Sequence, residues 1–300
     1  MPQEWSSDVY RDVLESLPLG VYLVDRRRQI SFWNREAERI TGYLAQEVIG
    51  HFCHENLLMH CDENQTILCG TACPLSKTMY DGKRRDSHMF LRHKAGQRVP
   101  VRARTIPIRD ESGMIAGSAE CFEERLTRHG STSQRIPADA ELDKVTGLPV
   151  PRAMHAAFEA LLQDTKVSRA AFGILCVTID DLDRLRHLCG REAMHEVLYA
   201  TGQTLLGGTR PDDLVGLWEQ ERFAVLVECG SIANLHSCAE RLKRLVGTAS
   251  VPWWGDRLSI TLSIGGTMLR DGDSLESLLH RAGEAFALSR AQPGNSVLVV

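Results

Sequence analysis

The sequence predicts a mixed α/β (α+β) fold class in two domains: an antiparallel sheet with flanking helices, then a central sheet with surrounding helices. Three observations lead to this prediction. The length of 300 residues is roughly twice the usual size of one domain. Strand-like segments joined by hairpin turns cluster before Glu124, whereas helix and strand patterns alternate after Glu141.

Composition places the chain among ordinary globular proteins. Apolar residues make up 43% and charged residues 25%, and the formal net charge is −4. This balance gives no basic surface for nucleic acid, no apolar run reaches the roughly 18 residues of a membrane span, and "MPQEWSSDVYRD" is no signal peptide. We therefore expect a cytoplasmic protein that contacts neither nucleic acid nor membrane. Its nine cysteines are then expected to be thiols or ligands.

The first half opens with a helix pattern and two short strands. The spacing of apolar residues predicts a helix over residues 8–17, which ends before Pro18. Strands are predicted at 20–25 and 30–34, and a second helix over 35–43. A long Cys- and His-rich section without regular pattern follows.

From Arg85 onward the pattern is that of β structure. Strands are predicted at 87–93, 98–108 and 114–124, because the hairpin turns "KAGQ" and "DESG" separate them. These segments complete an antiparallel sheet.

Residues 126–140 are predicted to be a linker. The sequence around them contains Gly130 and Pro137, and Pro137 cannot lie inside a continuous helix. A rigid rod joining the two domains is therefore not expected.

The second half alternates between helix and strand patterns. The predicted elements are a strand at 170–180, a helix at 183–206, a hairpin at 210–228, a helix at 232–246, a strand at 258–266, a helix at 275–288 and a strand at 296–300.

The segment "GVYLVDRRRQISFWNREAERITGYLAQEVIGH", residues 20–51, resembles the opening strands and first helix of PAS domains. The three later strands fit the sheet of that family. The resemblance extends over the domain expected at residues 1–125. It implies a sensor that binds a ligand or cofactor, or that dimerises, without fixing the ligand.

Two segments of the second half resemble GGDEF domains, the family of diguanylate cyclases. "DKVTGLPVPRAM" is similar to the opening motif, and "LSIGGTMLRDGDSLESLLHRAGEAFALSR" to the closing strand and helix. The resemblance covers residues 141–300 and implies a cyclase-like palm domain. The predicted hairpin, with "WEQERF" at its turn, stands where the family carries its characteristic turn.

The chain departs from this family at the positions of its metal-binding acids. The resemblance implies a first acid at Thr178, with Asp180 two residues later, and further acids at Glu221 and Arg222. A threonine hydroxyl cannot replace the carboxylate charge that Mg²⁺ prefers, and an arginine reverses the charge beside the metals.

Further departures affect the phosphate and guanine positions. Glu219 and Gln220 replace two glycines that let the backbone approach the phosphates. Arg186 and His195 replace an Asn and an Asp that read guanine, and Arg290 replaces a Lys. The expected result is a degenerate, non-catalytic domain. Its vestigial catalytic positions are Thr178, Asp180, Glu219, Gln220, Glu221 and Arg222.

A second site is suggested five residues before the turn. Arg210 and Asp213 form an RxxD sequence with the spacing of the family's inhibitory site, where cyclic di-GMP binds, and Arg241 falls where a second Arg is expected. A guanidinium can donate to guanine O6 and N7 or to phosphate. The alternative is ordinary surface charge.

The Cys- and His-rich section carries a third candidate site. Cys53, Cys61, Cys69 and Cys73 lie within 21 residues, with His51, His54 and His60 between them. Four soft ligands are enough for zinc or an iron–sulfur cluster, although the spacing fits no standard pattern. A metal, a haem, a redox pair such as Cys69 and Cys73, and buried structural thiols all stay open.

The sequence therefore predicts a cytosolic signalling protein with a PAS sensor domain and a degenerate GGDEF domain that binds cyclic di-GMP or a protein partner. Both families commonly dimerise, so a homodimer is expected. Two alternatives remain: a residually active cyclase in which Asp180 and Glu221 hold one metal, and a scaffold that binds no small molecule.

Overall fold

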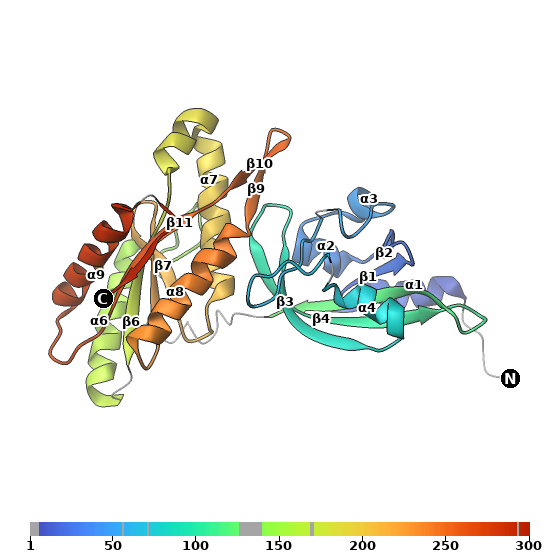
Figure 1. Ribbon diagram of the computed structural model, residues 1–300, viewed down its shortest axis with the longest axis horizontal. Coiled ribbons are helices and arrows are strands. Elements are labelled where there is room, and N and C mark those ends of the chain that lie inside the picture. Colours follow the sequence, from blue (N-terminus) through green and yellow to red (C-terminus); the bar gives the residue numbers. More distant parts are fainter. Residues whose placement is uncertain (1–5, 56, 71, 126–139, 169–170, 293) are drawn as a thin grey trace. The chain divides into compact units, whose positions relative to one another are not determined.

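A computed structural model describes residues 6–55, 57–70, 72–125, 140–168, 171–292 and 294–300 (Figure 1). The chain divides into two compact units, a first unit of residues 1–94 and 99–125 and a second unit of residues 95–98 and 126–300. The predicted linker lies outside the described residues except for residue 140. Among the described helices, none combines the length and the apolar character that crossing a membrane requires.

The first unit is built on a five-stranded antiparallel sheet, as the sequence predicted. Its strands follow the order β2-β1-β5-β4-β3. They are β1 (Gly20–Asp25), β2 (Ile30–Trp33), β3 (Arg85–Arg92), β4 (Arg98–Arg109) and β5 (Ile115–Glu124). Tyr22 on β1 lies opposite Glu120 on β5, and both side chains are buried in the unit's interior.

Helices and the Cys-rich section complete this core. The helices are α1 (Ser7–Ser16), α2 (Arg35–Thr41), α3 (Ala45–Val48) and α4 (Pro74–Asp81). The sequence had not predicted α4, which begins with Pro74 at its first position. Cys53, Leu58, Cys73 and Leu75 from the Cys-rich section pack with Tyr22, Trp33, Leu91 and Phe122 of the sheet.

Asn34 is the buried connection between α1, β1 and α2. Its Oδ1 accepts hydrogen bonds of 2.9 Å from the N–H groups of Val21 and Ala37. Its Nδ2 donates to the carbonyls of Leu14 and Leu19, at 2.9 and 2.8 Å. One side chain therefore caps α2 and satisfies three further backbone groups.

The second unit contains a mixed five-stranded sheet in the order β12-β11-β6-β8-β7. Its strands are β6 (Phe172–Ile179), β7 (Leu214–Glu219), β8 (Arg222–Glu228), β11 (Leu262–Met268) and β12 (Val297–Val299). Only β11 and β12 run parallel among the pairs described. The strand and hairpin predictions around residues 170–228 are confirmed.

The prediction of one strand over residues 258–266 was wrong. The structure has a separate hairpin of β9 (Ser250–Trp253) and β10 (Asp256–Ser259), and β11 starts afterwards at Leu262. Trp254 and Gly255 both adopt positive φ angles, of 50° and 89°, and reverse the chain between the two strands. Leu258 consequently pairs with Val251 and not with the central sheet.

Helices cover both faces of the central sheet (Figure 1). They are α6 (Pro151–Ser168), α7 (Leu182–Gly208), α8 (Ile232–Gly247) and α9 (Leu275–Arg290). Side chains of α7 and α8 pack in one core, and those of α6 and α9 in another on the opposite face. Gly265 lets α9 approach β11 closely, because a Cβ there would lie 2.1 Å from the nitrogen of Phe286. The sequence had predicted all of these helices except α6.

We predict that Asn34→Ala destabilises the first unit by about 2 kcal/mol or more, since it removes a helix cap and leaves buried backbone groups without partners. Hydrogen exchange followed by mass spectrometry should then show about 30-fold faster exchange in peptides spanning β1 and α2. Asn64→Ala, at an exposed position, is the matched control. Equal protection in both variants would contradict the role given to Asn34.

Candidate functional site

The turn between β7 and β8 is a tight two-residue connection, although it contains no Gly, Asn or Asp. Gln220 and Glu221 separate the strands, and Glu221 adopts a left-handed φ of 63°. Across the turn, Arg222 donates a 2.7 Å hydrogen bond to the carboxylate of Glu219. This ion pair joins the last residue of β7 to the first residue of β8. The register of the two strands shifts between Leu217 and Glu219.

Glu221, the one family acid that the turn retains, is paired with a cation. Its Oε2 lies 2.5 Å from Nη2 of Arg186 on α7, and Arg186 Nη1 also donates to Asp183 at 2.9 Å. Arg186 was predicted to stand at a guanine-reading position. In the structure it forms an ion pair with Glu221, at a position where the resemblance implies a metal-binding acid.

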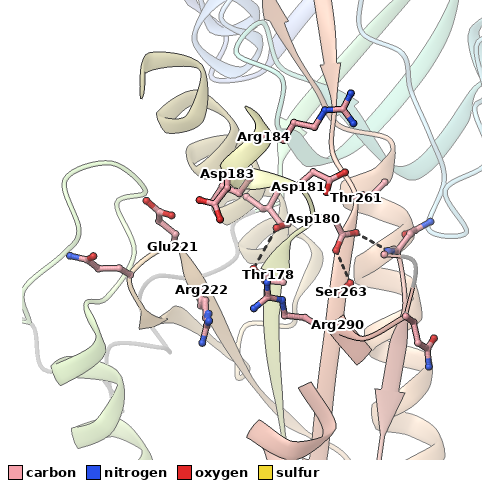
Figure 2. A pocket seen from close by; sticks show the side chains of 16 residues that line it. Thr178, Asp180, Asp181, Asp183, Arg184, Glu221, Arg222, Thr261, Ser263 and Arg290 are labelled. Atoms are coloured by element: carbon pink, nitrogen blue, oxygen red, sulfur yellow. Dashed lines mark hydrogen bonds between the residues drawn. The ribbon is translucent and has the colours of Figure 1, made fainter. Parts of the chain in front are cut away.

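Asp180 lies after β6 and is engaged by other groups (Figure 2). Its Oδ1 accepts a 2.6 Å hydrogen bond from Ser263 Oγ, and its Oδ2 accepts one of 2.7 Å from the N–H of Asn295. Asp180 therefore connects the end of β6 to β11 and to the segment before β12. This structural role could not be predicted from the sequence, because Ser263 and Asn295 lie more than 80 residues away along the chain.

Asp180 and the turn residues Gln220, Glu221 and Arg222 line one cavity of about 800 Å³, here called the hairpin cavity. Its charged lining residues are Asp180, Asp181, Asp183, Arg184, Glu221, Arg222 and Arg290. Figure 2 shows that they come from the end of β6, the start of α7, the turn and the end of α9. Arg222 and Arg290 both lie over the ring of Phe286, at 5.4 and 6.0 Å. Acids and guanidiniums are thus mixed around the cavity.

The donor set of the hairpin cavity does not fit a two-magnesium centre. Thr178 carries no charge, Glu221 is paired with Arg186, and Arg222 brings a positive charge to the lining. Within the described part of the chain, no group of three or more His, Cys, Asp or Glu side chains is arranged to hold a metal ion. His195, at a position where the resemblance implies guanine reading, lines a neighbouring cavity of about 290 Å³.

Arg210, Asp213 and Arg241 come together around a second cavity, of about 560 Å³, here called the arginine cavity. Arg210 and Asp213 precede β7, and Arg241 lies on α8, 31 or 28 residues away in sequence. The structure therefore brings together the three residues that the sequence had grouped. Cys229 and Cys238 also line the cavity, whereas sequence analysis had left them out.

Asp213 fixes the conformation of the RxxD turn. Only 3% of the residue is exposed. Its carboxylate accepts hydrogen bonds from the N–H groups of Arg210, at 2.8 Å, and of Glu228, at 3.3 Å. Burial raises the pKa of Asp213, while these backbone bonds and the charges of Arg210 and Arg241 oppose the increase.

Arg241 is held from two sides. Its Nη1 donates to the carbonyl of Gly208 at the end of α7, and its Nη2 lies 3.7 Å from Cys238 Sγ. Cys238 precedes Arg241 by three residues and shares its helix face, a relation that the sequence spacing could have indicated. Two guanidiniums can donate hydrogen bonds to an anionic, base-containing ligand, and the carboxylate can accept them.

The four candidate cysteines of the first unit are distributed around its core. Cys53, Cys61 and Cys73 are buried, and Cys69 is half-buried. Cys69 Sγ lies 4.0 Å from Nδ1 of His60. Among the described residues none of the nine cysteines is in a disulfide. The metal and cofactor predictions for these residues stay predictions.

A buried polar group lies beside these thiols. Nε2 of His60 is 3.3 Å from Oε1 of Glu120, and Tyr22 is hydrogen-bonded to the same carboxyl group. Burial raises the pKa of Glu120 to about 7, and the bond from Tyr22 opposes that increase. Sequence analysis did not single out Glu120 or Tyr22, because their strand positions carry no motif.

Comparisons with known proteins assign both halves of the chain. The sequence profile "Diguanylate cyclase, GGDEF domain" matches residues 140–296, and the profile "PAS fold" matches residues 9–122.

Relatives and solved structures match the second half. Response regulator PleD from Caulobacter vibrioides is 27% identical over 162 residues, which cover 53% of this chain and 36% of PleD. Diguanylate cyclase DgcM from Escherichia coli is 24% identical over 178 residues, covering 59% and 43%. The chain spans less than half the length of these relatives. One solved structure with the same fold is the GGDEF domain of DgcB from Caulobacter crescentus in complex with c-di-GMP. The TM-score is 0.51 at 18% sequence identity, and the match covers 55% of this chain and 98% of the DgcB chain.

We predict that the stability of the first unit falls as pH rises through the range in which Glu120 titrates. Its folded pKa of about 7 lies above the unfolded value, near 4.5. The stabilising proton is therefore fully bound below about pH 4.5 and is lost as pH rises through 7, at a cost of up to about 3 kcal/mol.

Glu120→Gln lacks this titrating group. The unfolding free energy of the variant minus that of the unmodified protein should therefore be larger at pH 8 than at pH 5. Urea titrations at both pH values measure the difference. Glu123→Gln, at an exposed position on the same strand, should show no such pH dependence. A parallel response of both variants would refute the assignment.

Proposed function

Because the chain belongs to the family of diguanylate cyclase GGDEF domains and carries a PAS domain before it, we propose that it is a non-catalytic signalling protein that binds cyclic di-GMP in the arginine cavity. One observation carries the proposal. Arg210, Asp213 and Arg241, which are separated by up to 31 residues, line the same cavity. Its volume of about 560 Å³ falls within the usual range for small-molecule sites.

The chemistry of the arginine cavity suits a cyclic dinucleotide. Such a ligand presents anionic phosphates and guanine edges, and a guanidinium can form paired hydrogen bonds with either. Asp213 keeps the backbone of Arg210 in place through its bond to that residue's N–H. The role of Asp213 is thus in part to position Arg210, in addition to the ligand contact that the sequence suggested.

The proposed lack of catalysis is supported by the charges around the hairpin cavity. Condensing two GTP molecules in this family needs metal ions that polarise the phosphates. Glu221 is paired with Arg186, and Asp180 bonds to Ser263 and Asn295. Holding a divalent cation would require breaking these contacts and overcoming the repulsion of Arg222.

We predict that the purified protein makes no cyclic di-GMP from GTP in the presence of either Mg²⁺ or Mn²⁺. Chromatography of the nucleotides after prolonged incubation measures the product. The alternative function, a residual cyclase in which Asp180 and Glu221 hold one metal, requires product that disappears in Glu221→Ala. Detecting such product would replace the non-catalytic proposal with that alternative.

We predict that the protein binds cyclic di-GMP and that Arg210→Ala weakens the affinity at least about tenfold, because a charge-assisted hydrogen bond contributes roughly 1.5–3 kcal/mol. Calorimetric titration measures both proteins. Arg244→Ala is the matched control, since Arg244 is an exposed arginine of α8 that does not line the arginine cavity.

Binding that is unchanged in Arg210→Ala would move the ligand to another site. No binding to the unmodified protein would favour the remaining alternative, a scaffold that acts by docking a protein partner.

A further inference from the structure

One histidine of the first unit connects a half-buried thiol to a buried carboxyl group. Nδ1 of His60 lies 4.0 Å from the sulfur of Cys69, and Nε2 of the same ring lies 3.3 Å from Glu120. His60 is 8% exposed and Glu120 is 2% exposed. A thiol, an imidazole and a carboxyl group that follow one another at such distances are the set of groups that can activate a cysteine for nucleophilic attack.

The fold holds each member of this arrangement in place. Cys61, next to His60, exchanges two backbone hydrogen bonds with Phe90 on β3, at 2.9 and 2.8 Å. The carbonyl of His60 accepts a 2.8 Å bond from Leu68, the neighbour of Cys69. Glu120 projects from β5. The positions of thiol and ring are therefore set by the sheet and not by a single loop.

Arg28 fixes Cys69 from a further direction. Its guanidinium donates a 3.1 Å hydrogen bond to the carbonyl of Cys69. Arg28 also accepts, through its own carbonyl, a 3.0 Å bond from the N–H of Cys53. These two bonds tie Arg28 to the backbone on both sides of the section, at Cys53 and at Cys69.

Cys53 and Cys73 are two further thiols of the same section, and they are not equally suited to form a disulfide with Cys69. Burial is the main cause that raises the pKa of Cys53, and the nearby thiols of Cys73 and Cys69 add to it. Cys53 therefore stays protonated and is the poorer nucleophile. Cys73, four residues after Cys69, occupies the N-cap position of α4, which leaves it as the better partner.

Thiol chemistry fits this cluster better than metal ligation or simple packing. In the part of the chain that the structure describes, no set of three potential ligands converges on one point. Cys53 and Cys73 belong to the hydrophobic core. Cys69 does not belong to it and is only half-buried, so part of the residue is exposed to solvent.

We propose that Cys69 is a hydroperoxide-reactive thiol, that His60 is its general base, and that Cys73 resolves the oxidised product into a disulfide. His60 accepts the thiol proton, and the sulfur attacks one peroxide oxygen. The O–O bond breaks, Cys69 becomes a sulfenic acid, and the leaving oxygen takes the proton as water or alcohol. The sulfur of Cys73 then attacks the sulfur of the sulfenic acid, the S–O bond breaks, and the hydroxyl group leaves as water with the thiol proton of Cys73, which gives the disulfide.

The two thiols thereby give two electrons to one peroxide. Glu120 acts as a positioning residue that orients the ring of His60. This function would give the PAS domain an oxidant as its input, and it does not depend on nucleotide binding in the arginine cavity.

The test uses the full chain, reduced and then exposed to a small excess of hydrogen peroxide. Timed samples are quenched with N-ethylmaleimide or dimedone and mapped by mass spectrometry. We expect Cys69 to be oxidised at least about tenfold faster than Cys189, a half-buried thiol of the second unit, and to appear in a Cys69–Cys73 disulfide. Equal rates for Cys69 and Cys189 would overturn the proposal.

Variants separate the two steps. Cys73→Ser should retain fast oxidation and accumulate the dimedone adduct of Cys69. His60→Asn should slow oxidation of Cys69 by at least about tenfold, as expected for the loss of a general base, without changing the rate at Cys189. His51→Asn, at an exposed histidine of the same section, should leave both rates unchanged.

Labelling of the buried Cys61 by N-ethylmaleimide reports whether His60→Asn disturbs the fold. If it does, the proposal is tested by the oxidation rates of Cys69 and Cys189 in the unmodified protein. Unchanged oxidation of Cys69 in a folded His60→Asn variant would also overturn the proposal.

Discussion

The position of β6 in the middle of its sheet determines where the functional residues of the second unit can lie. This strand bonds to β8 on one side and to β11 on the other. Its end leads through Thr178 to Asp180 in the hairpin cavity, and Ala171, just before its start, lines the arginine cavity. Eight residues at about 3.3 Å each separate the two ends by roughly 26 Å. No described residue lines both cavities, so one can lose a function while the other keeps its own.

The charges of the turn illustrate such a separation. Arg186 with Glu221, and Arg222 with Glu219, are half-exposed ion pairs, and pairs of this kind contribute only about 0–1 kcal/mol to stability. Their main consequence is electrostatic, because each places a cation beside an acid where the resemblance implies metal-bound phosphates. Glu221 also takes a left-handed backbone conformation, which the tight connection requires. The backbone of the turn is thus tight, while its side chains carry both signs of charge.

Local patterns in the sequence predicted most strands and helices, and the resemblance to GGDEF domains predicted the grouping of Arg210, Asp213 and Arg241. The contact of Arg186 with Glu221 could not be predicted, because it depends on how α7 is rotated against a hairpin 35 residues away. The hairpin of β9 and β10 was missed since its turn, Trp254 and Gly255, lacks the usual pairs of turn residues. Cys69 and His60 belong to the Cys-rich section that the sequence singles out, whereas Glu120 lies on β5, and no spacing rule connects it to them.

The two proposed chemistries, thiol oxidation in the first unit and nucleotide binding in the second, are related by thermodynamic linkage whatever the path between them. If forming the disulfide changes the affinity for the nucleotide, then the nucleotide must change the reduction potential of the disulfide by the same free energy. A tenfold change in affinity corresponds to about 30 mV for a two-electron couple. A potential that does not respond to saturating nucleotide would mean that the PAS domain and the arginine cavity act independently. The chain would then carry two sensors, not one sensor and its output.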